Sequence, residues 1–164
     1  MIISRDKSLL YPPFAEQLRY FESRLAAAKL PFFFFMGLRT FEDQDELYEQ
    51  GRTKPGKIVT NAPGGYSMHN FGLAADYILD GMPEKPGIQW SWDTKADFNA
   101  DGRSDWMNMG EIAESCGLEW GGRWKRFPDL PHLQMICGLT LAEIREIYRG
   151  CGTLTALWSE LKAA

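Results

Sequence analysis

Two histidines and one aspartate of this sequence, which are of types that bind transition metals, each lie beside turn-forming residues. The segment SMHNFGLAAD, residues 67–76, carries His69 near its start and Asp76 at its end, and His132 follows a proline in DLPHLQM. A carboxylate beside the apolar run YIL is costly to bury unless it is paired, protonated or bound to a metal. Two histidines and an aspartate suit zinc, and three protein ligands leave the fourth position to water, as in catalytic sites. The spacing indicates a candidate zinc site; packed or surface histidines are the alternative.

The segments around these residues predict a mixture of helices and strands. Helices are expected over 13–29, 40–51, 105–116 and 140–150, followed by a last amphipathic helix with Leu154, Leu157, Trp158 and Leu161. A buried strand is expected at 31–38, a second strand at 73–79, and a strand pair at 118–124 and 132–137. Alternation in the second strand places Ala74, Asp76 and Ile78 on one face. Because helices and strands do not alternate as βαβ units, we expect an α+β fold with a small antiparallel sheet flanked by helices.

Length and composition fit a single globular domain. The chain has 164 residues, and its net charge of −4 argues against a general nucleic-acid binder. It has no apolar run of about 18 residues that could span a membrane. The N-terminal segment MIISRDKSLLYPPF lacks the apolar core of a signal peptide, so we expect synthesis in the cytoplasm. The odd number and spacing of Cys116, Cys137 and Cys151 predict reduced and mostly buried thiols.

Three stretches of the sequence resemble a known family of enzymes. SMHNFGLAAD has the pattern S-x-H-x-x-G-x-A-x-D, which resembles the signature of zinc peptidases that cut peptidoglycan stem peptides. This family includes D-Ala-D-Ala dipeptidases and carboxypeptidases and the L-alanyl-D-glutamate endopeptidases of phage lysis enzymes. Residues 37–65 are similar to the preceding segment of the L-alanyl-D-glutamate branch, and residues 117–135 are similar to the segment that carries the last ligand.

The resemblance implies a hedgehog- and D,D-peptidase-like fold and a zinc endopeptidase that hydrolyses the L-Ala–D-Glu bond of peptidoglycan stem peptides. It also implies one catalytic domain over residues 1–164 without a separate cell-wall-binding domain, acting as a monomer on the cell wall after phage-type release. Two alternatives stay open. The first is a D,D-carboxypeptidase or dipeptidase of the same family, and the second is a non-catalytic, zinc-stabilised binding module.

The same resemblance assigns roles to individual residues. It implies that the two histidines and Asp76 are zinc ligands, and it places an acid three residues before the last histidine, at Asp129. This carboxylate would take a proton from the zinc-bound water and later give it to the leaving amine. Glu119 is the competing candidate, because desolvation in its aromatic setting could raise its pKa. The alternative for Glu119 is a loop ion pair with Arg123.

Three further residues match positions of the family. Arg39 follows the predicted strand directly, where the family places an arginine that binds a substrate carboxylate or an oxyanion. The alternative for Arg39 is an ion pair with Glu42 or Asp43 at the start of the next helix. Ser67 would hold substrate or a ligand by a hydrogen bond, or would cap its turn. Gln44 would either line the substrate pocket or pack inside the protein.

A separate acidic loop has the pattern of a calcium site. Positions 1, 3, 5, 7 and 9 of such a loop fall on Asp97, Asn99, Asp101, Arg103 and Asp105, with Gly102 at the turn. Position 12 is Asn108 rather than a bidentate glutamate, so the affinity should be weak. The pattern predicts a structural or regulatory Ca²⁺ site that orders residues 93–108 and shapes one wall of the cleft. A solvated acidic turn is the alternative.

Overall fold

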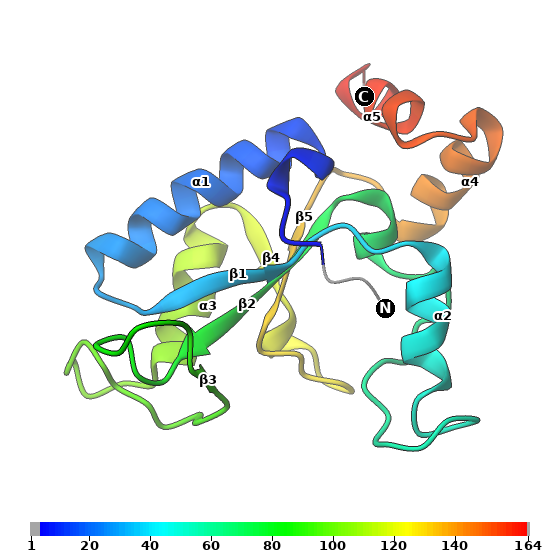
Figure 1. Ribbon diagram of the computed structural model, residues 1–164. Helices are drawn as coiled ribbons and strands as arrows, with labels where there is room; N and C mark the ends of the chain where they lie inside the picture. Colours follow the sequence, from blue (N-terminus) through cyan, green and yellow to red (C-terminus); the bar gives the residue numbers. More distant parts are fainter. Residues whose placement is uncertain (1–3, 164) are drawn as a thin grey trace.

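A five-stranded antiparallel sheet forms the centre of the computed structural model, which describes residues 4–163 (Figure 1). The strands are β1 (Phe32–Met36), β2 (Ala74–Asp80), β3 (Trp90–Ser91), β4 (Leu118–Trp120) and β5 (His132–Met135). The helices are α1 (Pro12–Ala27), α2 (Phe41–Glu49), α3 (Asp105–Ser115), α4 (Leu141–Cys151) and α5 (Leu154–Ala163), with 3₁₀ turns η1 (Lys7–Leu9), η2 (Met68–Phe71) and η3 (Gly121–Arg123). The α+β class predicted from the sequence is confirmed.

The register of the sheet brings two of the predicted ligands together. The strand order is β1-β2-β5-β4, and β3 pairs with the end of β2. Asp76 of β2 lies directly opposite His132 of β5 on one side and Met36 of β1 on the other. Residues directly opposite each other in an antiparallel pair point to the same face, with Cβ atoms about 4.5–5.5 Å apart. Backbone pairing alone therefore places the Asp76 and His132 side chains beside each other.

The two faces of β2 have different surroundings. Ala75, Tyr77 and Leu79 belong to the hydrophobic core, which β2 shares with α1 and α3. Figure 1 shows these two helices packed along the sheet. Asp76 and Ile78 line a groove on the other face, as the alternation predicts. One face of the strand thus stabilises the fold while the other is left for a site.

Side-chain caps fix where two of the helices begin. The Thr40 side chain accepts a hydrogen bond from the Asp43 N–H at the start of α2, and Thr140 and Glu143 form the predicted capping box of α4. The expected end of α4 at Gly150 is wrong, since the helix continues to Cys151. It ends there because Gly152 adopts a left-handed φ of 73°. Within the described residues, no helix is long and apolar enough to cross a membrane.

Three other expectations need correction. The strand expected at 31–38 to be buried is shorter, and Phe32–Phe35 are only half-buried, because β1 lies at the edge of the sheet. The two-residue strand β3 lies in the segment 81–104, where the sequence shows no strand pattern. The three cysteines are free thiols but only half-buried. Each follows or ends a helix or strand, where burial is incomplete.

Close packing between α3 and β4 depends on a glycine within the helix. The Trp120 side chain is 1% exposed, and its Nε1 donates to the Leu130 carbonyl at 2.8 Å. A Cβ atom at Gly110 would lie 2.2 Å from the indole ring, and a Cβ atom at Gly122 would lie equally close at 2.2 Å. The indole fills space that only glycine leaves open on both sides.

We predict that Gly110→Ala lowers the free energy of unfolding by about 1–3 kcal/mol, because the new methyl group overpacks the contact with Trp120. The sign of this change in unfolding free energy is informative. Helix propensity alone would make the alanine variant more stable, by about 1 kcal/mol, so destabilisation would reveal the overpacking. Gly150→Ala in α4 is the matched control, because a Cβ atom there meets nothing within 4 Å. Urea denaturation should show the control unchanged or stabilised. A stabilised Gly110→Ala protein would contradict this account of the packing.

Candidate metal centre

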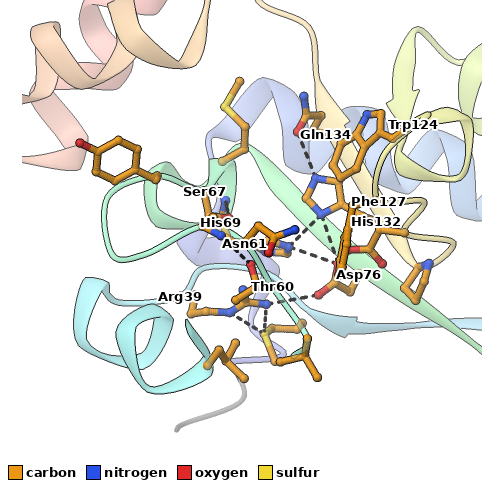
Figure 2. A pocket seen from close by; sticks show the side chains of 18 of the residues that line it. Arg39, Thr60, Asn61, Ser67, His69, Asp76, Trp124, Phe127, His132 and Gln134 are labelled. Carbon is orange, nitrogen blue, oxygen red and sulfur yellow. Dashed lines mark hydrogen bonds and ion pairs between the residues drawn. The ribbon is translucent and has the colours of Figure 1, made fainter. Parts of the chain in front are cut away.

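His69, Asp76 and His132 converge on one point in the groove (Figure 2). His69 Nε2 lies 3.2 Å from Asp76 Oδ1 and 3.2 Å from His132 Nδ1, and His132 Nδ1 lies 3.5 Å from Asp76 Oδ1. Four ligands around a tetrahedral zinc ion, with bonds of about 2.0–2.1 Å, would lie about 3.3 Å from one another. Among the residues that the structure describes, this is the one group of at least three histidine, cysteine or acidic side chains placed to hold a metal ion.

His69 is held by a short turn and by the backbone of the neighbouring strand connection. The turn η2 begins at Ser67, whose Oγ accepts a hydrogen bond from the His69 N–H at 3.3 Å. The turn ends at Gly72, which has a left-handed φ of 70°. The imidazole Nδ1 lies 2.7 Å from the Gly37 carbonyl oxygen, which can only accept. Nδ1 therefore carries the proton, and the Nε2 lone pair faces the site.

His132 presents its other ring nitrogen to the same point. Its Nδ1 faces Asp76 and His69, while its Nε2 lies 3.0 Å from Gln134 Oε1. An Nε2–H group that donates to this oxygen leaves the Nδ1 lone pair free for a metal ion. Two unprotonated imidazole nitrogens and a carboxylate oxygen, mutually spaced as above, fit zinc.

The charges of the cluster favour the protonation states that a metal needs at Asp76 and His69, whereas a metal ion at His132 must displace a proton. Burial raises the pKa of Asp76, but the two imidazoles outweigh burial and hold this pKa well below its usual range. Burial lowers the pKa of His69 despite the nearby Asp76. Burial also lowers the pKa of His132, but the hydrogen bond and charge of Asp76 prevail and raise it. Asp76 is thus ionised and His69 is neutral near pH 7, as metal ligands must be.

Arg39 is the third polar or positively charged side chain that contacts Asp76, after His69 and His132. The arginine is 8% exposed, and its Nη2 lies 3.4 Å from Asp76 Oδ2. Its Nη1 donates to Gln44 Oε1 at 2.7 Å, and its remaining nitrogens contact the Met36 sulfur. Burial lowers the pKa of Arg39, against the opposing charges of Asp76 and Asp129. The alternative of an ion pair with Glu42 or Asp43 is not the contact that holds this guanidinium.

The prediction that Gln44 binds substrate is corrected by its burial. The side chain is 0% exposed, and its Nε2 donates to the Ala62 carbonyl at 2.7 Å. Its amide thus connects Arg39 to the loop that precedes His69. Helical periodicity places Gln44 on the inner face of α2, but it does not reveal that Arg39 lies between Gln44 and the groove.

Asp129 lines the groove just before β5. Its backbone N–H donates to the Gly121 carbonyl at 3.0 Å, and its own carbonyl accepts from the His132 N–H at 3.2 Å. The side chain is half-buried, and burial together with the charge of Asp76 raises the pKa of Asp129 to about 6. A carboxyl group with this pKa can both accept and donate a proton near neutral pH.

Glu119 also lines the groove, but both of its oxygens are engaged. Oε1 accepts from Trp124 Nε1 at 2.7 Å, and Oε2 accepts from Gln134 Nε2 at 3.2 Å. The alternative of an ion pair with Arg123 is wrong, because Arg123 pairs with Glu114 at 3.0 Å. Gln134 was missed in the sequence. Its position two residues after His132, on the same face of a strand, is the signal that could have found it.

The groove has a volume of about 850 Å³ and an aromatic rim. Tyr66 is 48% exposed, and the Arg145 guanidinium lies 3.4 Å from its ring centre. The Trp124 ring lies 4.9 Å from the His132 ring, between centroids. Residues 59–63 of the long loop before His69 form another part of the lining, as expected of a functional loop.

The acidic loop lies apart from this groove. None of residues 97–105 lines it, so the expectation that the loop shapes a wall of the cleft is wrong. Asn99 instead reaches the end of α1. The carboxylates of Asp97 and Asp101 accept backbone N–H groups within the loop. Asp105 is 0% exposed, with one oxygen bonded to a backbone N–H and the other without a hydrogen-bond partner.

Comparisons with known proteins connect this site to peptidoglycan peptidases. Residues 60–135, which contain all three converging side chains, match the model of a family described as D-alanyl-D-alanine carboxypeptidase. The chain is 55% identical over 100 residues to the peptidoglycan L-alanyl-D-glutamate endopeptidase CwlK of Bacillus subtilis (strain 168), covering 61% of this chain and 58% of that protein. The chain therefore spans less than two thirds of the length of that relative.

The fold is similar to a solved structure as well. The crystal structure of the Serratia marcescens L-Ala D-Glu endopeptidase ChiX matches with a TM-score of 0.51 and 26% sequence identity, over 80% of this chain and 84% of that one. These similarities confirm the resemblance that the sequence motifs indicated.

We predict that the protein binds one zinc ion and that Asp76→Ala abolishes this binding. Removing the carboxylate takes away one ligand and the charge that balances the metal. Titration against a chromogenic chelator should give a one-to-one complex for the wild type, and zinc should raise its melting temperature. Asp80→Ala, at the end of the same strand, is the control and should bind zinc normally. Equal zinc affinity in Asp76→Ala would rule out this centre.

Proposed function

We propose that this chain hydrolyses the L-Ala–D-Glu amide bond of peptidoglycan stem peptides. The premise is that it contains a domain of the zinc peptidase family, which includes D-alanyl-D-alanine carboxypeptidases and L-alanyl-D-glutamate endopeptidases. The observation that carries the proposal is the convergence of His69, Asp76 and His132 in a groove that Asp129 also lines. Similarity to two endopeptidases of this specificity supports the choice of bond.

The chemistry follows from the groups in the groove. A bound zinc ion would supply a water molecule of lowered pKa and would polarise the amide carbonyl. The carboxylate of Asp129 accepts a proton from the attacking water and transfers it to the amide nitrogen as the C–N bond breaks. The pKa of Asp129, raised to about 6, suits both halves of this transfer.

Arg39 and Ser67 support the reaction from the edge of the cluster. We assign to Arg39 the stabilisation of negative charge that develops on the amide oxygen, since it lines the groove with the metal ligands and its Nη2 lies 3.4 Å from Asp76 Oδ2. Ser67 Oγ accepts from the His69 N–H, so its own hydroxyl hydrogen can donate to a substrate carbonyl. Gln44 takes part only through Arg39, whose orientation it holds.

An endopeptidase fits the groove better than a carboxypeptidase. The residues that line the groove with the metal ligands include Trp90 of β3 and Leu141 of α4, so the groove is larger than a pocket around the ligands alone. An endopeptidase needs room for peptide on both sides of the scissile bond, whereas a carboxypeptidase needs a pocket that ends at a carboxylate. The non-catalytic binding module is disfavoured by Asp129, because a purely structural zinc site has no use for an acid with a pKa near 6.

The same proposal covers the setting in which the protein acts. We propose the peptidoglycan stem peptide as its partner and the cell wall as its place of action, which the similarity to CwlK supports. That it acts as a monomer, with residues 1–164 as one catalytic domain, is part of the same proposal.

We predict that zinc-loaded protein releases peptides that begin with D-Glu from purified peptidoglycan fragments, as measured by mass spectrometry. Asp129→Asn should lower kcat/KM by about 10²–10⁴-fold while zinc affinity changes little, because only the proton carrier is removed. Asp93→Asn, an exposed change of the same kind, is the control. Loss of terminal D-Ala instead would establish the carboxypeptidase, and no cleavage by the zinc-loaded wild type would favour the binding module.

We also propose that the acidic loop binds Ca²⁺ weakly as a structural ion, which must draw the loop carboxylates together because they do not converge on one point in the structure. Asp97, Asn99, Asp101 and Asp105 offer side-chain oxygens, and Arg103 would offer its backbone carbonyl, since its side chain pairs with Glu111. The support is the buried Asp105 oxygen that has no hydrogen-bond partner. Asn108 donates to Asp101 at 2.7 Å and supplies no carboxylate, which keeps the affinity low.

We predict that Ca²⁺ at roughly tenfold excess over its Kd raises the melting temperature by about 3–6 °C. Mg²⁺ at the same concentration should have a smaller effect, and Asp101→Asn should remove the Ca²⁺ effect. Differential scanning calorimetry with zinc already bound separates this site from the metal centre. A melting temperature that does not respond to Ca²⁺ would show that the loop is only a solvated acidic turn.

A further inference from the structure

A line of hydrogen-bonded side chains extends away from the metal centre behind His132. His132 Nε2 lies 3.0 Å from Gln134 Oε1, and Gln134 Nε2 lies 3.2 Å from Glu119 Oε2. Glu119 Oε1 in turn lies 2.7 Å from Trp124 Nε1. Figure 2 shows the contact between Gln134 and His132 beside Trp124. We call these four residues the His132 chain.

The pairing of β4 with β5 builds this chain into the sheet. Glu119 of β4 lies directly opposite Gln134 of β5, and Gln134 is two residues from His132. All three side chains therefore share one face of the sheet. Trp124 follows η3 and closes the chain, with its ring against the His132 ring.

The donor and acceptor groups of Trp124 and Glu119 allow only one direction for the hydrogen bonds of the His132 chain. The Trp124 indole N–H can only donate, and an ionised Glu119 carboxylate can only accept. Gln134 must then point its NH₂ group at Glu119 and its oxygen at His132. That oxygen can only accept, so His132 Nε2 must carry the ring proton, and Nδ1 keeps the lone pair that faces Asp76 and His69.

We propose that Gln134 and Glu119 are positioning residues that fix the Nε2–H tautomer of His132 and thereby set its Nδ1 as a metal ligand. The inference rests on the metal centre of the proposed function, but it does not depend on which bond is cleaved. It also assigns a role to Glu119 other than that of a general base, since both of its oxygens serve the chain. Partners of this kind around metal-binding histidines typically change metal affinity by about 10- to 100-fold.

A substitution that reverses the donor-to-acceptor direction of the hydrogen bonds in the His132 chain tests the proposal, and it changes the side-chain volume little. In Glu119→Gln, the new amide has one oxygen to face two donors, Trp124 Nε1–H and the Gln134 NH₂ group. Gln134 can restore its own bond only by turning its NH₂ group toward His132, which then favours the Nδ1–H tautomer and blocks the ligand atom. We expect zinc affinity to fall by about 10- to 100-fold.

The double variant Glu119→Gln with Gln134→Glu supplies the rescue. A carboxylate at position 134 accepts from His132 Nε2–H and from the new amide at 119, whose oxygen accepts from Trp124. Every donor again has an acceptor, so zinc affinity should return to within a few fold of the wild type. Glu114→Gln on α3, outside the chain, is the matched control and should bind zinc normally.

Two measurements test the hydrogen-bond direction of the His132 chain, and neither needs peptidoglycan. Chelator competition gives the zinc affinity, and ¹⁵N NMR of the metal-free protein at alkaline pH gives the tautomer of each ring. The protein has only two histidines, so the ¹⁵N signals of both imidazole rings can be assigned. The wild type should show His132 protonated at Nε2, and Glu119→Gln should shift it toward Nδ1–H while remaining folded by its melting curve.

Three outcomes would overturn the proposal. The first is an Nδ1–H tautomer in the metal-free wild type. The second is a zinc affinity of Glu119→Gln within twofold of the wild type, and the third is no recovery of zinc affinity in the double variant. Failure to cleave peptidoglycan would count against the proposed function and leave these readouts unaffected.

Discussion

The carboxylate of Asp76 is the group around which the site is organised. Its side chain is 16% exposed, and keeping it ionised there would cost several kcal/mol without partners. His69, His132 and Arg39 supply those partners, at 3.2, 3.5 and 3.4 Å. Each partner is in turn held by one further group: His69 by the Gly37 carbonyl, Arg39 by Gln44 and His132 by Gln134. The need to stabilise the Asp76 carboxylate thus explains why so many polar side chains are buried nearby.

The hydrophobic core sets the geometry of this polar cluster. Ala75 and Leu133 are both 0% exposed and lie opposite each other, one position along from Asp76 and His132. A slip of one residue between β2 and β5 would exchange the faces and bury His132 against α1 and α3. The large apolar surface on the core side forbids that slip. Packing of residues that never touch the groove therefore determines where the metal ligands stand.

Local patterns were sufficient for the fold class, most helices and the choice of His69 and Asp76 as candidate ligands. The role of Asp129 came only from family resemblance, since its raised pKa depends on tertiary burial that no local pattern shows. The sequence left Gln44 open between pocket lining and packing, because periodicity identifies an inner helix face but not the arginine that covers it. The chain from Glu119 to His132 was missed because it depends on the register of two strands joined through η3 and a loop. Such contacts between strands leave little trace in a single sequence.

The two histidines are held as ligands by different kinds of group. His69 donates from Nδ1 to a backbone carbonyl, which no side-chain substitution removes. His132 donates from Nε2 into a chain made of side chains, and that chain ends at Trp124 in the wall of the groove. A peptide that packs against Trp124 would shield the chain from water and strengthen its hydrogen bonds, because they lie in a lower dielectric. His132 and this wall of the groove are therefore one hydrogen-bonded unit on the β4–β5 side, whereas His69 is held independently of that wall.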